Sequence, residues 1–546
     1  MPAARSQTLP PEPGRQRRWT RPVSVNAVLV AATALALGLR IYQLTRPGYL
    51  LGVTEYDDGT DFGSAVLLVD GYLPYRDFII VQPPGITLLM APAAVAAKWV
   101  GTAWGMAVGR MLTAAAGAAA VGLAGLLVRH RGLIAVILTC GILAVYPAAV
   151  QAAHTVLLEP WLVLFCVAGA VAVFDGDRLA GPRRLAWGGA AFGFAGAIKV
   201  WAILPVVVIL VLAARQPRRA ATYAAGVAAG FIVAVLPFAA LAPRTFFNSV
   251  VLAQLVRIDT VRVTLAFRLH EMTGMTDFTG VATTVPLLII ALAIVVLAGG
   301  SCALASRLTR QPPPPLERFA LGASAVTVAA FLWPADFYYH YAGFLAPFLA
   351  MAVALPVARL VDALRPVDAV APAAGRRPAA RLLTSCAAAA AGIAVIAMAV
   401  IQTGAETALQ PPLGSTTPGV PDDVVAVVSR LVPPGACVLA DQVSYTIAAN
   451  RFSSAAPGCA HIVDGVGTDY SLSKGRNAAT GAQRVPAVRA VWLSALRGAQ
   501  YVWLSNLSYK RIPWSAAEIS DYFDRNFVPV RGGPFGLYVR KGLRPR

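Results

Sequence analysis

The chain has 546 residues, of which 57% are hydrophobic and only 13% are charged. A soluble surface cannot carry so apolar a composition, and the apolar blocks of roughly 15 to 25 residues without heptads also exclude disordered, collagenous and coiled-coil chains. The net charge of +20, from 46 Lys and Arg against 26 Asp and Glu, lies mainly between these blocks. We therefore expect a polytopic α-helical membrane protein and no nucleic-acid partner.

The apolar blocks predict about eleven transmembrane helices within a domain at about 24–402. They lie at about 24–44, 108–128, 133–150, 157–174, 186–200, 201–214, 221–242, 283–303, 319–333, 341–361 and 383–401. The basic tail 1–23 precedes the first block, and positive charge there keeps an N-terminus in the cytoplasm. A cleaved signal peptide over 1–36 is the competing interpretation.

This topology requires every second loop to be basic. The basic residues are found in the required loops, at Arg129/Arg131, Arg178/Arg183/Arg184, Arg215/Arg218/Arg219, Arg307/Arg310/Arg318 and Arg359/Arg365/Arg376/Arg377/Arg381. The first loop on the other side, 45–107, has the opposite sign. Its charges are six acids, Glu55, Asp57, Asp58, Asp61, Asp70 and Asp77, against Arg46, Arg76 and Lys98. We expect this loop outside the cell.

Within the outer loop, Ile86–Val100 is apolar but short, and it follows Pro83-Pro84. We expect a helix that lies near the membrane interface, because a crossing here would place all later basic loops outside.

The region 403–546 is rich in turn residues and predicts a small extracytoplasmic α/β domain. Its β-like runs include Cys437–Ala440 and Tyr501–Leu504, and a helix is expected near 422–431. Four cysteines lie within the apolar blocks, whereas Cys437 and Cys459 form an isolated pair on the oxidising side and are a candidate disulfide. No zinc-ligand spacing and no phosphate-binding glycine loop is present in the sequence.

Ionisable residues at membrane depth are expensive and are candidates for function. With this topology, many of them reach the same outer face, at Glu55, Asp57, Asp58, Asp61, Arg110, His154, Glu159, Lys199, Asp336, Tyr339, His340 and Tyr341. We expect them to converge on one extracytoplasmic cavity.

Each of these residues has a functional and a structural interpretation. The four clustered carboxylates can bind a divalent cation or supply a general base, or they can be a solvated acidic loop. Lys199 and Arg110 can neutralise a phosphate, or they can extend to the interface from apolar helices. His340 can be catalytic or part of an aromatic belt. Glu159 requires a partner, for which His154 and Lys199 are the candidates.

Several short motifs occur in a characteristic order. They are Asp57-Asp58 with Ala65, Gly71-Tyr72-Leu73-Pro74-Tyr75-Arg76-Asp77, Gln82-Pro83-Pro84-Gly85, Gly109-Arg110, Leu158-Glu159-Pro160, Ala197-Ile198-Lys199, and Tyr339-His340-Tyr341 with Pro347. Over about 24–361 this order resembles the GT-C superfamily of membrane glycosyltransferases. The similarity is greatest to the branch of protein O-mannosyltransferases and bacterial lipid A aminoarabinose transferases. The chain departs from that pattern with Asp58 for the usual Glu, Gln82 for His or Lys, and Gly85 for Leu.

The resemblance implies an inverting hexosyl- or pentosyltransferase of the plasma membrane. Such an enzyme takes a sugar from a polyprenyl-phosphate donor in the lipid bilayer and passes it to a cell-envelope glycan, lipid or protein outside. The implied base is Asp57, with Asp58 supporting it or exchanging roles, and Lys199 or Arg110 stabilises the leaving phosphate.

Supporting or acceptor-binding residues are then Glu55, Asp61, Arg76, Asp77, His154, Glu159, His340 and Tyr341. No cofactor is implied, apart from a divalent cation that Asp57, Asp58 and Asp61 can hold.

Two other classes of protein remain open. A transporter or flippase of lipid-linked sugars would also be polytopic with buried charges, although no convincing pair of internal repeats is seen. A non-catalytic scaffold would bind an envelope polymer through its outer domain.

Overall fold

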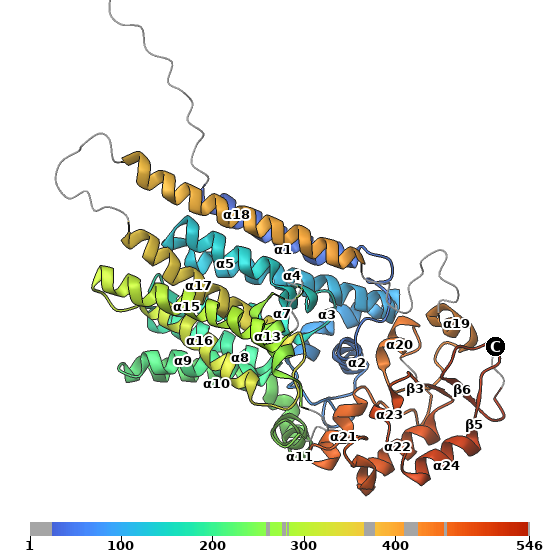
Figure 1. Ribbon diagram of the computed structural model, residues 1–546. Helices are drawn as coiled ribbons and strands as arrows, with labels where there is room; N and C mark the ends of the chain where they lie inside the picture. Colours follow the sequence, from blue (N-terminus) through green and yellow to red (C-terminus); the bar gives the residue numbers. More distant parts are fainter. Residues whose placement is uncertain are drawn as a thin grey trace, which may run out of the picture.

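A computed structural model describes residues 24–257, 262–275, 280, 283–364, 377–408, 424–452 and 456–543, with the backbone alone for 377–385. The expected cytoplasmic tail 1–23 and most of the basic loop after 364 lie outside these residues. A long helix bundle forms one end of the molecule, and a smaller part with a β-sheet forms the other (Figure 1). We refer to 424–452 and 456–543 as the C-terminal part.

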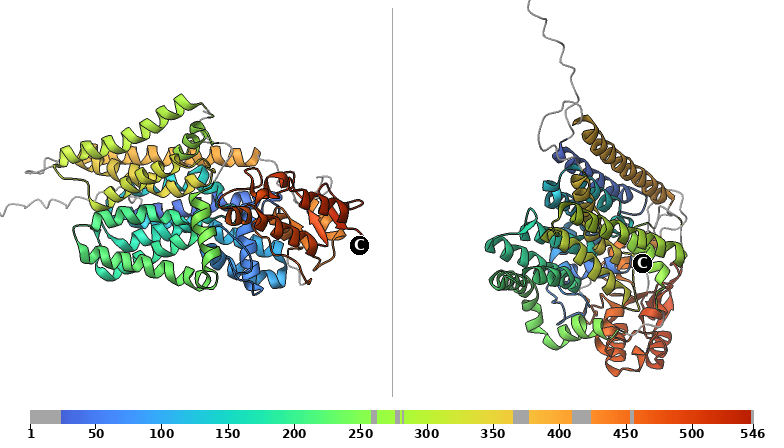
Figure 2. Two further views of the ribbon diagram at one scale, coloured as in Figure 1. Left: turned by 90° about the horizontal axis from the view of Figure 1, so that it is seen from below. Right: turned by 60° about the vertical axis from the view of Figure 1, so that its left-hand side comes forward.

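The bundle helices run roughly along one common direction (Figures 1 and 2). They are α1 (Val25–Leu44), α4 (Thr102–Val128), α5 (Leu133–Val145), α7 (Leu158–Val173), α8 (Pro182–Ile198), α9 (Ile203–Ala213), α10 (Pro217–Leu241), α15 (Thr284–Thr309), α16 (Pro315–Leu332), α17 (Tyr341–Ala363) and α18 (Arg377–Ala408). Each expected span overlaps one of these helices, several of which extend beyond it. Among the described residues, seven helices are long and apolar enough to cross a membrane, and further apolar helices are shorter. The chain is thus a multi-pass membrane protein, while the count of eleven crossings stays a prediction.

Some boundaries differ from those expected. The span at 133–150 is interrupted because Pro147 lacks an N–H and disfavours the helical conformation at Tyr146, so α5 ends and the short α6 (Pro147–Gln151) begins. The expected domain boundary at 402 falls inside α18, which continues to Ala408. Arg359, expected in a basic loop, is instead buried in α17, where its guanidinium bonds Glu317 at 2.8 Å.

Two helices follow α1 in the segment expected to lie outside. Of the acidic residues, Asp57 and Asp58 begin α2 (Asp57–Val69), whose positive N-terminal end favours the carboxylates of its first turn, and Asp61 lies one turn later. The predicted interfacial helix is α3 (Gly85–Val100). A Cβ on Gly85 would lie 2.5 Å from the carbonyl oxygen of Ala197, and one on Gly101 would lie 2.5 Å from Asn450. Both ends of α3 therefore lie at the end of the bundle that carries the C-terminal part.

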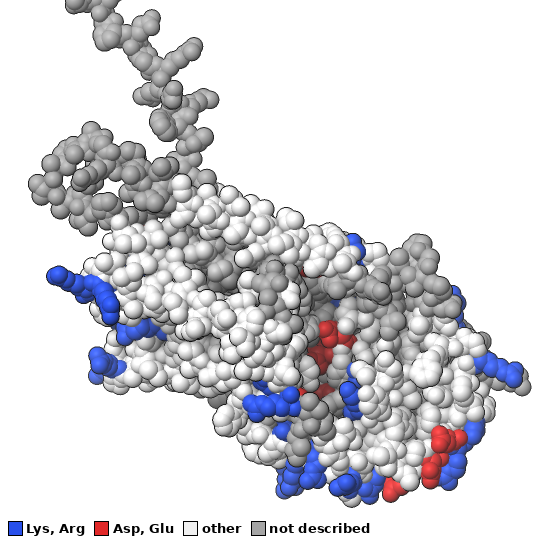
Figure 3. Space-filling view, viewed as in Figure 1, with Lys and Arg blue, Asp and Glu red and all other residues white. Residues whose placement is uncertain are grey.

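The basic turns meet at the opposite end of the bundle. Arg131 and His130, in the turn after α4, contact Asp177 at 2.7 and 3.1 Å. Asp177 lies between the two-residue strands β1 (Phe174–Asp175) and β2 (Arg178–Leu179). Basic side chains are visible at this far end (Figure 3). The alternation of loop charge along the sequence thus corresponds to two different ends of the bundle.

Short helices cross the end of the bundle nearest the C-terminal part. They are α11 (Pro243–Phe246), a π-helix (Phe247–Leu252), α12 (Ala253–Leu255) and α13 (Leu265–Thr273). The π-helix contacts the C-terminal part through the hydroxyls of Ser249 and Ser471, which are 2.8 Å apart.

The C-terminal part has the α/β character that was predicted. Its four-stranded sheet has the order β3 (Val438–Ala440), β4 (Tyr501–Trp503), β6 (Leu537–Arg540), β5 (Phe527–Pro529), with β3 and β4 parallel and the other pairs antiparallel. Its helices are α19 (Val424–Leu431), α20 (Val443–Ala448), α21 (Gly465–Ser473), α22 (Pro486–Gly498), α23 (Ser508–Arg511) and α24 (Ala517–Asn526). Alternate residues of β4 enter the apolar cores on the two faces of the sheet.

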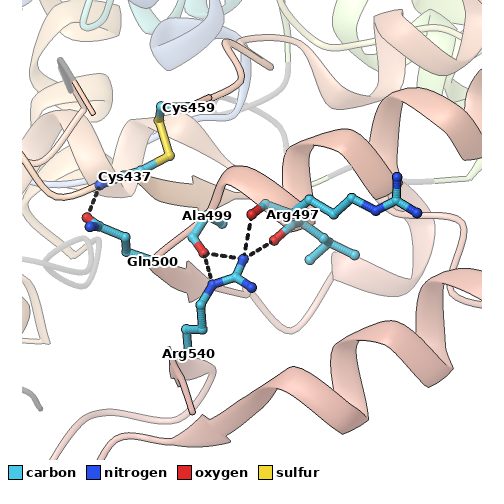
Figure 4. The surroundings of a disulfide bond; sticks show 7 residues. Cys437, Cys459, Arg497, Ala499, Gln500 and Arg540 are labelled. Atoms are coloured by element: carbon cyan, nitrogen blue, oxygen red, sulfur yellow. Dashed lines mark hydrogen bonds between the residues drawn. A yellow bond between two sulfur atoms is a disulfide. The ribbon is translucent and has the colours of Figure 1, made fainter. Parts of the chain in front are cut away.

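Cys437 and Cys459 form the expected disulfide, which joins the start of β3 to the loop before α21 (Figure 4). Gln500 lies beside it and accepts a hydrogen bond from the backbone N–H of Cys437 at 3.0 Å. A cross-link of this kind restricts the unfolded chain. It also ties the loop that leads to α21 to the sheet.

Glycines set the contact between α8 and α10. Gly189 and Gly193 on α8 face Gly226 and Gly230 on α10, and each approaches a backbone carbonyl of the other helix so closely that a Cβ would lie 2.0 to 2.4 Å from its oxygen. Small residues four apart allow such close approach in membrane helices. The helix that ends just before Lys199 is therefore fixed by backbone contact.

Gly193→Ala should lower the stability of the protein, because the new Cβ would lie 2.0 Å from the carbonyl oxygen of Val227. We expect a loss of roughly 1–3 kcal/mol, as is usual for overpacking. Thermal unfolding in detergent measures it. Gly299→Ala is the control, since a Cβ on Gly299 in α15 meets nothing within 4 Å. Equal melting temperatures for the two variants would contradict this account of the α8–α10 contact.

Candidate active site

Asp58 and Arg110 form a buried ion pair between α2 and α4. The guanidinium lies 2.9 Å from Asp58 Oδ2, and the side chains are 0% and 1% exposed. The hydroxyls of Thr54 and Thr155 also donate to Oδ2, both at 2.8 Å, and Ser444 lies 2.8 Å from Oδ1. Both oxygens of Asp58 are therefore engaged. The interpretation of the acids as a solvated loop is wrong for this residue.

Arg110 holds the chain that leads into α2. Its guanidinium donates to the carbonyl oxygens of Tyr49, Leu50 and Gly52 at 2.8 to 2.9 Å, in addition to Asp58. A guanidinium has only five N–H donors. These donors are used within the protein, so Arg110 has none left for the donor phosphate, the role that the sequence suggested.

Asp57 is placed differently from its neighbour. Its side chain is 49% exposed and lies 3.9 Å from His340 Nε2. Glu55 accepts a hydrogen bond from Tyr339 at 2.8 Å, and burial raises the pKa of Glu55 to about 7. Of the carboxylates at the start of α2, Asp57 is thus the one presented to solvent.

Glu159 lies between Lys199 and His340. Lys199 Nζ donates to Glu159 Oε1 at 2.7 Å, and His340 Nδ1 lies 3.0 Å from Oε2. Of the two partners expected for Glu159, Lys199 is therefore correct. The ammonium of Lys199 also lies over the rings of Trp201 and Tyr341, at 3.7 and 4.3 Å from their centroids. A chain of ionisable groups runs from buried Lys199 through Glu159 and His340 to half-exposed Asp57.

Asp61 lies one turn after Asp57 and is buried. Its Oδ2 accepts no hydrogen bond from the described residues, and burial raises the pKa of this carboxyl well above its usual value. Among those residues, no group of three or more His, Cys, Asp and Glu side chains is arranged to hold a metal ion. Asp57, Asp58 and Asp61 thus do not form the shared cation site that was considered.

Three predicted residues lie apart from these contacts. His154 does not contact Glu159; its Nε2 lies 3.7 Å from Glu406 of α18. Arg76 and Asp77 pair with each other at 2.7 Å, and Asp77 also accepts the backbone N–H of Leu73. This exposed pair closes a turn.

Several residues that complete the site have no recognisable signal in the sequence. Ser444, Gln442 and Asp464 come from the C-terminal part and contact the segment 55–58. Arg257, which follows α12, lies over the ring of Tyr470 at 4.4 Å, and its Nε is 3.8 Å from Asp336. Acidic side chains are visible in a hollow between the bundle and the C-terminal part (Figure 3).

The chain resembles known glycosyltransferases in part of its sequence and in its fold. Residues 81–334, slightly less than half of the chain, match the model of glycosyltransferase family 87. The resemblance to GT-C membrane glycosyltransferases is confirmed. A comparison with curated protein sequences found no significant match.

Two solved structures illustrate the shared fold. ArnT from Cupriavidus metallidurans, crystallised with undecaprenyl phosphate, is 16% identical, with a TM-score of 0.56 over 89% of this chain and 94% of that one. The Archaeoglobus fulgidus oligosaccharyltransferase, tethered to an acceptor peptide, is 15% identical, with a TM-score of 0.50 over 96% of this chain and 76% of that one. At these identities the likeness concerns the fold.

Arg110→Gln should strongly destabilise the protein, because it leaves the buried carboxylate of Asp58 without its cation. Breaking a buried pair typically costs about 3–5 kcal/mol. The exposed pair of Arg76 and Asp77 offers a matched control, and Arg76→Gln should change the stability little, because solvent screens an exposed pair. Thermal unfolding of both variants checks this, and a small loss for Arg110→Gln would contradict a structural role.

Glu55 should make the protein less stable as pH rises. Its pKa is raised from 4.5 to about 7 in the folded protein, so folding favours the protonated form. This stabilisation is complete below about pH 4.5 and is lost as pH rises through 7. Melting temperatures at pH 5 and pH 8 should differ less in Glu55→Gln than in the wild type. Glu518→Gln, at an exposed glutamate of α24, is the control and should show the same difference in melting temperature as the wild type. If Glu55→Gln also shows the wild-type difference, the raised pKa of Glu55 is not the cause.

Proposed function

We propose that the protein is an inverting membrane glycosyltransferase that moves a sugar from a polyprenyl-phosphate donor to a hydroxyl group of a cell-envelope acceptor. The observation that carries the proposal is the position of Asp57. Its carboxylate is half-exposed, the residues on both sides of it are held by hydrogen bonds, and the chain has a GT-C fold. The undecaprenyl phosphate bound by ArnT supports the choice of donor.

In the proposed reaction, Asp57 accepts the proton of the acceptor hydroxyl while that oxygen attacks the anomeric carbon. The bond from this carbon to the phosphate oxygen breaks, and the phosphate leaves with the electron pair. A base on the opposite face from the leaving group gives inversion. His340, 3.9 Å from Asp57, stabilises the ionised base when it is protonated.

Two cations are candidates for the leaving phosphate. Lys199 contributes a buried positive charge, although Glu159 and the two aromatic rings occupy much of its surroundings. Arg257 lies in the connection after α12, and its side chain is 22% exposed. We propose that Arg257 takes the role that the sequence suggested for Arg110, and that both cations reduce the charge developing on the phosphate.

We further propose eleven crossings, with the N-terminus in the cytoplasm and the C-terminal part outside the cell. The basic turns at the far end of the bundle favour this orientation. The disulfide between Cys437 and Cys459 also favours it, because such bonds persist on the oxidising side of the membrane.

The two other classes of protein, a transporter and a scaffold, predict different behaviour in assays. A transporter of lipid-linked sugars would move its substrate without an acceptor, and a scaffold would not depend on an ionised Asp57. The order of motifs and the match to glycosyltransferase family 87 favour the transferase.

Asp57→Asn should reduce sugar transfer by about 10²–10⁴-fold, the usual contribution of a general base. The assay uses purified protein, labelled polyprenyl-phosphate sugars and envelope-derived acceptors. Asp175→Asn is the control, because this exposed carboxylate lies at the far end of the bundle and pairs with Arg184. An unchanged rate in Asp57→Asn would reject the base, and transport in vesicles without any acceptor would favour the transporter.

A further inference from the structure

The segment 55–58 is held by the C-terminal part as well as by the bundle. Tyr56 donates its hydroxyl to Asp464 Oδ1 at 3.1 Å and accepts the backbone N–H of Val466 at 3.2 Å, both at the start of α21. The guanidinium of Arg511, from α23, lies 4.5 Å from the centroid of the Tyr56 ring. Contacts from two helices of the C-terminal part thus fix the residue directly before Asp57.

Ser444 provides a closer contact from α20. Its hydroxyl oxygen lies 2.7 Å from the carbonyl oxygen of Glu55 and 2.8 Å from Asp58 Oδ1. A hydroxyl has one proton and can donate to only one of them at a time. Gln442 supplies a separate donor to the Glu55 carbonyl at 3.0 Å, so the proton of Ser444 is available to Asp58.

The donor amide of Gln442 is itself oriented from the C-terminal part. Arg511 donates to Gln442 Oε1 at 2.8 Å and lies 3.2 Å from Asp441. With its oxygen held, the amide directs its nitrogen toward Glu55. One arginine therefore contacts the segment 55–58 both through Gln442 and through the ring of Tyr56.

The backbones of α2 and α20 touch at this point. A Cβ on Gly59 would lie 2.3 Å from Ser444 Oγ and 2.4 Å from its backbone nitrogen. Only glycine permits this approach. The contact is thus built into the first turn of α2, next to the proposed base.

We propose that Ser444 is a positioning residue for sugar transfer, which orients Asp58 and through it the turn of α2 that presents Asp57. The C-terminal part is then a component of the active site rather than a separate binding module. This inference rests on the proposed function, because it assigns Asp57 the role of base.

The test compares full-length Ser444→Ala with Ser429→Ala. Ser429 is a half-buried serine of α19 whose hydroxyl contacts the carbonyls of Val425 and Ala449. We expect kcat to fall about tenfold in Ser444→Ala, the order of effect of one hydrogen bond to a charged group. The KM for the donor should stay within about twofold, since a misplaced base slows the chemical step and leaves donor binding intact. Ser429→Ala should behave as the wild type.

Ser444→Cys distinguishes positioning from general damage, because a thiol is a weak donor of nearly the same shape. Its kcat should lie between those of the wild type and Ser444→Ala. A kcat in Ser444→Ala equal to that of Ser429→Ala would overturn the inference, as would parallel losses of activity and melting temperature in both Ser444 variants.

A second measurement does not require turnover. Amide hydrogen exchange of residues 55–61 should be faster in Ser444→Ala than in Ser429→Ala, because the turn loses its anchor. If the wild type transfers no sugar but exchange rises as expected, the proposed function fails while the anchoring by Ser444 stands. Unchanged exchange in this segment would reject the anchoring itself.

Discussion

The arrangement of the site depends on burying two opposite charges, Asp58 and Arg110, at one end of the helix bundle. Such a pair is stable only when further hydrogen bonds satisfy both partners. The backbone before α2 meets this requirement for the guanidinium. Thr54 and Thr155 from the bundle side and Ser444 from the C-terminal part meet it for the carboxylate. The backbone conformation around Asp57 is therefore determined by the hydrogen bonds that buried Asp58 and Arg110 require.

A second group of charges links the site to the packing of the bundle. Lys199 directly follows α8, whose glycines bring its backbone against α10. Its ammonium holds Glu159, and Glu159 lies 3.0 Å from His340, the residue beside Asp57. Because interiors are close-packed, a shift of α8 would be transmitted to these contacts. Helix packing and the electrostatic environment of the exposed carboxylate are thus connected.

Much of the fold could be predicted from the sequence, because the apolar blocks mark the helices and every second loop between them is basic. The need of Glu159 for a partner followed from the cost of a buried carboxylate, and Lys199 was one of the two candidates. The role of Arg110 could not be predicted, because its acceptors are main-chain carbonyls about 60 residues earlier, which carry no sequence signal. Ser444 was missed for a related reason: a single serine nearly 400 residues from Asp58 resembles any other.

The contact between α2 and α20 has a consequence for biosynthesis. Ser444, Asp464 and Arg511 are made only after Asp58 has been followed by almost 400 further residues. During synthesis the early helices enter the membrane with the first turn of α2 incompletely anchored. Its final geometry requires that the C-terminal part has been delivered to the same side and has folded. The nascent protein therefore remains without a finished site until Ser444, Asp464 and Arg511 have been made and folded.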